Sequence, residues 1–144
     1  MDFRVLRTLI VDDEPVARRV LREDLEMWPD VEVVGEAENG KDALLKIEQL
    51  QPDLVLLDLQ MPVMSGFEVA RKLSGENAPV VVVVTAFDQH AVEAFETGAV
   101  DYLLKPVSQA RLRTAVERAR RMQGRPLEIA NRMARIAVAA TGAK

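Results

Sequence analysis

The chain has 144 residues, of which 49% are hydrophobic, so it is long enough for one domain with its own core. It contains no cysteine, which excludes a disulfide framework and a thiolate metal site. The first residues lack a signal-peptide pattern, and no uncharged run approaches the roughly 20 residues that span a bilayer. We therefore expect a cytoplasmic protein with no membrane contact.

Arginines gather in the last third of a chain whose net charge is only -4. A basic stretch of this kind is one signature of nucleic-acid binding. However, Glu117 and Glu128 interrupt the run, and no aromatic residue lies among the arginines to stack on bases. We therefore expect a solvated helix face and a linker, without direct contact to DNA, from Arg111, Arg113, Arg118, Arg120, Arg121, Arg125, Arg132 and Arg135.

Short apolar runs alternate with segments in which apolar residues recur every three to four positions. These are the patterns of buried strands and amphipathic helices. Pro15 suits the first turn of a helix, and the residues before Pro52 end one. In chain order, the pattern predicts a strand at residues 5–11, a helix from 15 to about 28, a strand at 31–34, a turn over 35–40, a helix at 43–50, a strand at 54–57, a helix at 65–73, a strand at 80–84, a helix at 89–96, a strand at 102–104 and a helix at 109–122.

Strands that alternate with helices indicate an α/β fold. We expect a doubly wound, five-stranded parallel sheet with helices on both faces and right-handed crossovers, formed by residues 1–122. After Gly124-Arg125-Pro126 the alternation stops. Residues 123–144 are therefore expected to form a linker or tail that docks as a helix, mediates association or leads into a further domain.

A polar residue follows directly after four of the apolar runs. Because the carboxyl ends of parallel strands share one edge of the sheet, where ligands bind, we expect these side chains to meet. They are Asp12 and Asp13 after the first strand, Asp58 after the third, Thr85 after the fourth and Lys105 after the fifth. Residues far apart in the sequence would thus form one site.

The residue types at this edge suit phosphoryl transfer. Three crowded carboxylates repel one another unless a cation compensates them, and a set of oxygen ligands favours Mg²⁺ over zinc or copper. A metal ion and Lys105 on two sides of Asp58 would stabilise a phosphoryl group, with Asp58 as nucleophile and the Thr85 hydroxyl on a phosphoryl oxygen. The alternative is structural: acids that cap turns and a threonine that serves its β propensity.

These residues stand in motifs that resemble the receiver domain of bacterial two-component response regulators, over residues 4–121. The motifs are Val11-Asp12-Asp13-Glu14-Pro15, Asp53-Leu54-Val55-Leu56-Leu57-Asp58-Leu59-Gln60-Met61-Pro62 followed by Ser65-Gly66, Thr85-Ala86, and Asp101-Tyr102-Leu103-Leu104-Lys105-Pro106. The resemblance implies that Asp58 accepts a phosphoryl group from a histidine kinase. It also implies that Mg²⁺ is held by Asp12, Asp13, Asp58 and the backbone carbonyl of Gln60.

The resemblance further implies a flavodoxin-like sheet of strand order 2-1-3-4-5 and a switch. Thr85 would move toward the phosphoryl group while the ring of Tyr102 turns inward. Lys105–Pro106 would be a cis peptide, and Gly66 would occupy a backbone position that a β-carbon obstructs. The protein would promote its own phosphorylation and dephosphorylation without being an enzyme, and would bias a homodimer surface of the fourth helix, fifth strand and fifth helix.

Residues 85–96 resemble more closely the receivers of regulators that carry a LytTR-type DNA-binding domain. Such proteins follow the receiver with an arginine-rich helix, a linker and a β-rich effector domain, whose opening strand residues 134–138 resemble. The expected output is therefore transcriptional control, with DNA contacted only through an effector domain that this chain lacks.

Two other functions are compatible with parts of the pattern. A stand-alone receiver that acts as an adaptor for a protein partner is the main alternative, because residues 1–122 do not decide the output. An aspartate-nucleophile phosphatase also combines acids, a hydroxyl, a lysine and Mg²⁺ on a parallel sheet. Such enzymes place two aspartates two residues apart after the first strand and need a cap over the substrate, whereas Asp12 and Asp13 are adjacent and no insertion supplies a cap.

Overall fold

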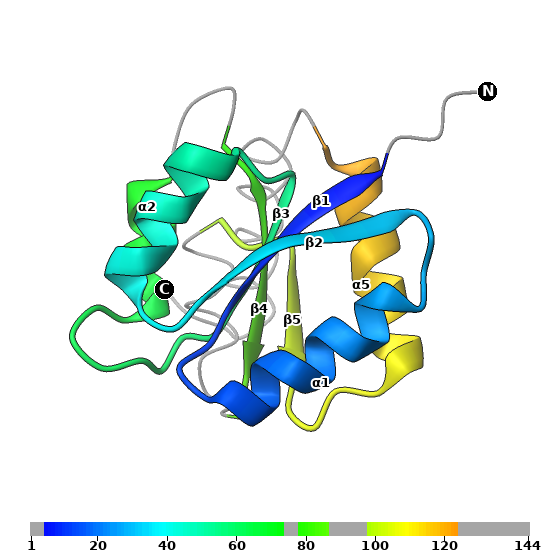
Figure 1. The fold of residues 1–144 in the computed structure, drawn as a ribbon, viewed down its shortest axis with the longest axis horizontal. Helices are drawn as coiled ribbons and strands as arrows, with labels where there is room; N and C mark the ends of the chain where they lie inside the picture. The colour runs from blue at the N-terminus through cyan, green and yellow to red at the C-terminus, as the bar shows by residue number, and fades with distance from the viewer. Residues whose placement is uncertain (1–4, 74–77, 87–97, 124–144) are drawn as a thin grey trace, which may run out of the picture.

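A computed structural model describes residues 5–73, 78–86 and 98–123. Within these residues, five parallel strands form one sheet in the order β2-β1-β3-β4-β5 (Figure 1), which confirms the predicted fold class and strand order. The strands are β1 (Leu6–Val11), β2 (Val31–Ala37), β3 (Leu54–Leu57), β4 (Val80–Thr85) and β5 (Asp101–Leu104), and the helices are α1 (Pro15–Glu26), α2 (Gly40–Leu50), α3 (Gly66–Lys72) and α5 (Gln109–Arg121). The helix predicted at residues 89–96 and the tail predicted from residue 124 onward lie outside the described residues.

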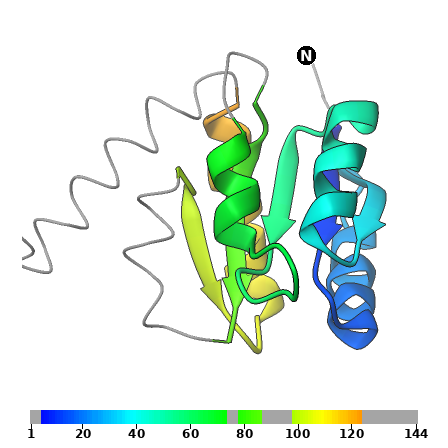
Figure 2. The same cartoon turned by 90° about the vertical axis from the view of Figure 1, so that its left-hand side faces the viewer.

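Both faces of the sheet are covered by helices, because successive side chains of a strand point to opposite faces. Leu54 and Leu56 pack into the apolar cluster that includes α1 and α5, whereas Val55 and Leu57 pack into the cluster that includes α2 and α3. Figures 1 and 2 show these two pairs of helices on opposite sides of the sheet. Burial on both faces explains why the central strands are continuous apolar runs in the sequence.

Strand β2 is longer than the sequence predicted, since it continues to Ala37 instead of ending before Gly35. Gly35 pairs with Leu9 in the ladder to β1. A β-carbon on Gly35 would lie 3.0 Å from the side chain of Leu50, so this glycine marks the close approach of α2 to the strand. The prediction of a turn from residue 35 was therefore wrong, because glycine is used both in turns and at close contacts within a strand.

Polar side chains at the helix starts explain where α2 and α3 begin. The Asn39 side chain accepts a 2.8 Å hydrogen bond from the Asp42 amide, so α2 begins earlier than predicted. Ser65 and Glu68 accept hydrogen bonds from each other's backbone amides, at 3.3 and 3.4 Å, which forms a capping box. Ser65 is therefore the cap of α3 and Gly66 its first helical residue.

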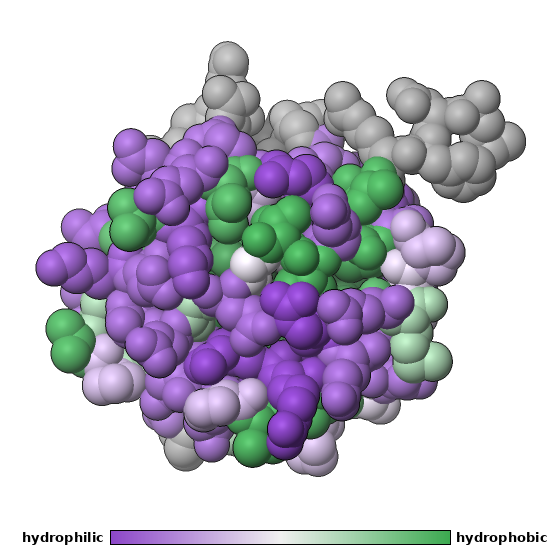
Figure 3. Space-filling view, in the orientation of Figure 1, coloured by the Kyte–Doolittle hydropathy of each residue, from purple (hydrophilic) through white to green (hydrophobic). Residues whose placement is uncertain are grey.

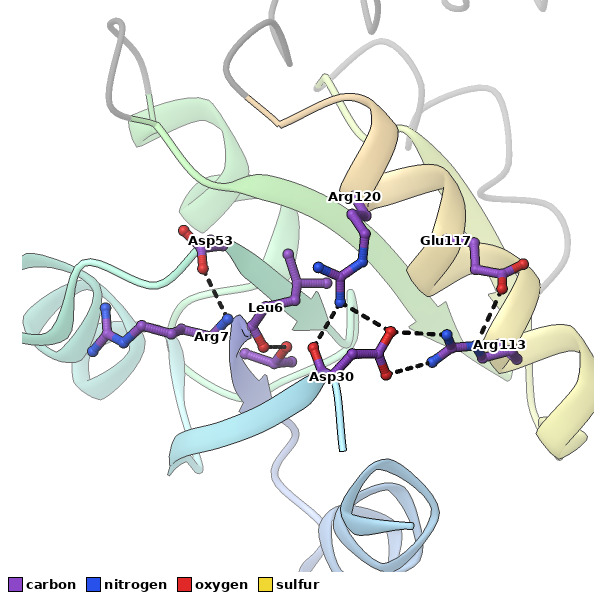
Figure 4. A network of polar contacts seen from close by, with 8 residues as sticks. Leu6, Arg7, Asp30, Asp53, Arg113, Glu117 and Arg120 are labelled. Carbon is purple, nitrogen blue, oxygen red and sulfur yellow. Dashed lines mark hydrogen bonds and ion pairs between the residues drawn. The ribbon is translucent and has the colours of Figure 1, made fainter. Parts of the chain in front are cut away.

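Helix α5 is tied to Asp30, the residue directly before β2 (Figure 4). Arg113 donates hydrogen bonds of 3.0 and 2.9 Å to the two carboxylate oxygens of Asp30, and Arg120 donates a 2.6 Å bond to the Asp30 carbonyl oxygen. The Arg113 guanidinium also lies 5.2 Å from the ring centroid of Trp28. The hydrogen bond from Arg113 holds the pKa of Asp30 below its ordinary value, although burial opposes this.

Two further arginines of α5 bind a buried acid of β5. Arg111 donates hydrogen bonds of 3.1 and 2.7 Å to Asp101, and Arg118 lies 3.2 Å from the same carboxylate. The predicted solvated arginine face is therefore only partly correct for the described part of α5: Arg111 and Arg121 are exposed, but Arg111 and Arg118 also form ion pairs within the domain.

Within the described residues, no helix is both long and apolar enough to cross a membrane. The face seen in Figure 3 is mostly hydrophilic, and hydrophobic residues emerge in separate patches. The large apolar side chains exposed in the described residues are Val5, Val16, Val20, Met27, Leu45, Val63 and Leu104.

Candidate functional site

Three carboxylates meet at the carboxyl ends of β1 and β3, which are neighbours in the sheet. Val11 pairs with Leu57 in the ladder, so the residues that follow them lie side by side. Carboxylate oxygens of Asp12, Asp13 and Asp58 all lie within 4.8 Å of one another. Asp12 and Asp58 are buried, with 1% and 5% of their surface exposed, while Asp13 is exposed.

Lys105 reaches the acids from the end of β5. Its backbone amide donates a 2.8 Å hydrogen bond to the Thr85 carbonyl oxygen. This bond holds the backbone of Lys105 in place against the end of β4. Its Nζ lies 2.7 Å from Asp12 Oδ2 and 3.5 Å from Asp58 Oδ2. Burial alone would lower the pKa of Lys105, but the hydrogen bond to Asp12 and the surrounding negative charges raise it. The charged ammonium therefore offsets part of the negative charge of the cluster.

Burial also governs the ionisation of Asp58. Removal from water raises the pKa of its carboxyl to about 6, and the charges of Asp12 and Asp13 act in the same direction. A 3.1 Å hydrogen bond from the Gln60 amide to Asp58 Oδ1 and the charge of Lys105 oppose this rise. Asp58 therefore differs from an ordinary surface aspartate, because its carboxyl keeps its proton up to a higher pH.

A pocket of about 250 Å³ opens at this cluster. Its lining residues come from the ends of four strands (β1, β3, β4 and β5) and the loops beyond them, and they are Asp13, Glu14, Asp58, Gln60, Thr85, Ala86 and Lys105. Within the described part of the chain, the buried Thr85 Oγ1 has no hydrogen-bond partner. A buried hydroxyl in this state is rare in proteins, so it favours a ligand oxygen that enters the pocket.

Three further residues singled out in the sequence do not line this pocket, but the structure describes each of them. A β-carbon on Gly66 would lie 2.2 Å from the Asp58 carbonyl oxygen, so only glycine fits at this approach of α3 to the loop. The Lys105–Pro106 peptide bond is cis. Tyr102 is half-buried on β5 and packs against the apolar cluster on the α2 and α3 face.

The donor set at the acids suits a divalent cation with a preference for oxygen. Asp12, Asp13 and Asp58 supply only carboxylate oxygens, and their crowding creates negative charge that Lys105 compensates only in part. The residues present therefore fit the predicted metal, and the ion would be held by these three acids.

Two residues beside the site were not predicted from the sequence. Glu14 lines the pocket, and its Oε1 lies 3.5 Å from Lys105 Nζ. Arg18 donates a 2.7 Å hydrogen bond from Nη1 to the carbonyl oxygen of Asp12. The helical position of Arg18 was the available signal, because long side chains near the start of a helix point back toward the loop before it.

Comparison with known proteins agrees with this geometry. Residues 8–117 match the family model of the response regulator receiver domain. The chain belongs to this family. Receiver domains are generally signalling domains and not enzymes, so the phosphatase alternative loses its support.

Relatives of this receiver are response regulators. It is 48% identical over 130 residues to an uncharacterized response regulatory protein of Vibrio cholerae, covering 89% of this chain and 50% of that protein. It is 46% identical over 116 residues to the transcriptional regulatory protein BtsR of Escherichia coli, covering 81% of this chain and 48% of BtsR. The chain thus spans about half the length of the curated relatives it matches.

Solved structures of receiver domains resemble the fold closely. The response regulatory domain of MrkE from Klebsiella pneumoniae matches with a TM-score of 0.74 and 32% identity, covering 80% of this chain and 95% of that one. The receiver domain of NarL from Mycobacterium tuberculosis matches with a TM-score of 0.75 and 31% identity, covering 81% of this chain and 98% of that one.

Proposed function

We propose that this receiver accepts a phosphoryl group on Asp58 from the phosphohistidine of a sensor kinase. The observation that carries the proposal is the meeting of a buried carboxylate, an ammonium and an unsatisfied hydroxyl in one pocket. These groups belong to Asp58, Lys105 and Thr85, from three different strands.

In the proposed reaction, an Asp58 carboxylate oxygen attacks phosphorus. A bond forms between this oxygen and phosphorus, and the bond from phosphorus to the donor's imidazole nitrogen breaks, with its electron pair returning to the ring. Lys105 stabilises the charge on the phosphoryl oxygens, because its Nζ already lies 3.5 Å from Asp58 Oδ2. The hydrogen bond from the Gln60 amide holds the other carboxylate oxygen in place.

Mg²⁺ would compensate the negative charge of the acids and of the phosphoryl group. Its ligands would be Asp12, Asp13 and Asp58 and, by family resemblance, the Gln60 carbonyl. Two of these acids are held by hydrogen bonds, Asp12 by Lys105 and Asp58 by the Gln60 amide, so they would offer oriented ligands to the ion. Asp13 is exposed, whereas the other two acids are buried, so an ion would reach the site from solvent past Asp13.

After transfer, the phosphoryl oxygens would offer acceptors to Lys105 and Thr85. The Thr85 hydroxyl is available for such a bond, and Tyr102 lies on the adjacent strand as the second member of the proposed switch. We propose that the switch biases a homodimer surface that includes β5 and α5. Pro106 and Gly66 would serve structural roles beside it.

The kinase would dock beside the phosphoacceptor, in the cytoplasm. An apolar groove of about 390 Å³ runs from α1 to the loop after β5, and it shares Glu14 and Lys105 with the pocket. Exposed Val16 and Val20 line it and offer apolar contacts to a kinase helix.

We also propose that the output is transcriptional. BtsR is named a transcriptional regulatory protein, and the match covers about half of it. Residues 1–122 would then form the receiver and residues 123–144 the linker toward an effector domain that contacts DNA. The relationship to LytTR-type regulators stays a prediction.

The proposal is tested by the mass of the intact protein after incubation with acetyl phosphate and Mg²⁺. We expect one phosphoryl adduct on the wild type, and none on Asp58→Asn or in the presence of EDTA. An adduct of equal yield on Asp58→Asn would contradict the assignment of Asp58. An adduct that forms equally in EDTA would contradict the role of the metal.

A further inference from the structure

Arg18 is held at two points beside the acids. Its Nη1 donates a 2.7 Å hydrogen bond to the carbonyl oxygen of Asp12, and its Nε donates a 3.0 Å bond to Glu36 Oε1 on β2. Only 15% of the side-chain surface is exposed. Because a guanidinium is planar and rigid, two such bonds fix its orientation and also fix the carbonyl group that it binds.

The carbonyl that Arg18 binds belongs to the peptide unit that joins Asp12 to Asp13. Asp12 is also held by other bonds: its amide donates to the Ala37 carbonyl oxygen at 3.0 Å, and its Oδ1 accepts from the Glu14 amide at 2.9 Å. Asp13, in contrast, is exposed. The direction of its carboxylate therefore depends on the peptide unit that Arg18 fixes.

We infer that Arg18 is a positioning residue for the proposed metal site. By fixing the peptide between Asp12 and Asp13, it sets the Asp13 carboxylate against those of Asp12 and Asp58. The inference rests on the proposed function, since it assumes a cation at these acids. Replacing a residue that orients a metal ligand typically weakens metal binding by about 10-fold to 100-fold.

Charge and position predict opposite effects of removing Arg18. As a cation near a metal site, Arg18 repels the ion, so a role through charge alone predicts tighter metal binding once the guanidinium is gone. A role in positioning predicts weaker binding. The sign of the change therefore separates the two roles.

Arg22 provides a matched control on the same helix. Its Nε lies 2.5 Å from Glu36 Oε2, so it binds the same carboxylate as Arg18 from the other oxygen. Its described partners are Glu36 and Glu26, and neither belongs to the site. Replacing Arg22 thus removes one positive charge and one bond to Glu36, without removing a bond to Asp12.

The experiment is calorimetric titration of Mg²⁺ into the wild type, Arg18→Gln, Arg18→Lys and Arg22→Gln, without a phosphodonor. Circular dichroism melts of each variant report the fold. We expect both Arg18 variants to bind Mg²⁺ about 10-fold more weakly, and Arg22→Gln to bind as the wild type does. Arg18→Lys keeps the charge, but one ammonium does not span Asp12 and Glu36 as the guanidinium does.

Unchanged or tighter binding by folded Arg18→Gln and Arg18→Lys would overturn the inference, and so would equal weakening in Arg22→Gln. If these variants match a wild type that binds Mg²⁺ and becomes phosphorylated, only the inference fails. A wild type that neither binds Mg²⁺ nor becomes phosphorylated contradicts the proposed function, and the inference falls with it.

Discussion

Lys105 Nζ donates a 2.7 Å hydrogen bond to Asp12 Oδ2 and so joins the end of β5 to the end of β1. The same ammonium lies 3.5 Å from Asp58 Oδ2. Lys105 thus stands between a proposed metal ligand and the proposed phosphoacceptor. In the proposed function it would compete with a cation for Asp12 and assist phosphoryl transfer at Asp58.

The Lys105→Met variant should separate these two effects. Loss of the ammonium removes a competitor for Asp12, so Mg²⁺ should bind at least as tightly as in the wild type. Loss of charge stabilisation should slow phosphorylation by acetyl phosphate about 100-fold at saturating Mg²⁺. Calorimetry gives the affinity, and phosphorylation followed by intact mass gives the rate, with the exposed Lys72→Met variant as control. An unchanged rate in Lys105→Met would rule out its proposed role.

The Asp58→Asn variant should be more stable than the wild type in EDTA near neutral pH. Burial raises the pKa of Asp58 to about 6 from 3.8, so the folded state loses stability as pH rises between these values. At about 1.4 kcal/mol per pKa unit, the variant should gain up to about 3 kcal/mol above pH 6. The gain should vanish below about pH 4, where the carboxyl is protonated in both states.

Urea unfolding of both proteins across this pH range measures the difference. Added Mg²⁺ should stabilise the wild type and narrow the gap to Asp58→Asn, because the variant lacks one of the three carboxylates. A difference in unfolding free energy that stays constant with pH would show that the ionisation of Asp58 does not control it.

The ion pairs of Asp30 should stabilise the attachment of α5. In Asp30→Asn, Arg113 and Arg120 lose a partly buried charged acceptor (Figure 4), which should cost about 1–2 kcal/mol of unfolding free energy near neutral pH. Because Arg113 lowers the pKa of Asp30 below 3.8, this stabilisation is present above that value and is lost as pH falls through the folded pKa.

The urea concentrations at the unfolding midpoints of the wild type and Asp30→Asn should therefore become equal as the pH falls below the folded pKa of Asp30. The variant Arg121→Gln, at an exposed position of the same helix, should change little at any pH. Equal stability of Asp30→Asn and the wild type near neutral pH would mean that desolvation cancels the ion pairs.

The Gly66→Ala variant should destabilise the domain by about 2 kcal/mol or more, since backbone atoms must move to accept the methyl group. The added β-carbon would lie 2.2 Å from the Asp58 carbonyl oxygen and 2.8 Å from the Leu59 Cα. Gly35→Ala is the matched control, because its β-carbon meets only side-chain ends, the nearest at 3.0 Å. Similar urea midpoints for the two variants would contradict this account.

The sequence predicted the elements that depend on local patterns. Buried strands such as β3 are continuous apolar runs, and strand ends mark where Asp12, Asp58 and Lys105 meet, because parallel topology brings their carboxyl ends together. The prediction from sequence failed at Gly35, because glycine is used both in turns and at close contacts within a strand. Gly35 lies within β2, where the absence of a side chain leaves room for α2.

Side-chain partners across the fold were beyond the reach of the sequence. The arginines of α5 were expected to face solvent, but Arg111 and Arg118 bind Asp101, and Arg113 and Arg120 bind Asp30. Such pairs depend on the packing of α5 against strands that lie elsewhere in the chain. The bond from Arg18 to the Asp12 carbonyl oxygen, in contrast, is local, and the position of Arg18 in the first turn of α1 was a signal for it.

The most direct test of the central claim is to locate the phosphoryl group. The protein would be treated with acetyl phosphate and Mg²⁺, reduced with borohydride, which converts an aspartyl phosphate into homoserine, and mapped by peptide mass spectrometry. Our account predicts homoserine at position 58 and unmodified aspartate at positions 12 and 13. Homoserine at position 12 or 13 with intact Asp58, or a phosphoryl group on another residue type, would contradict it.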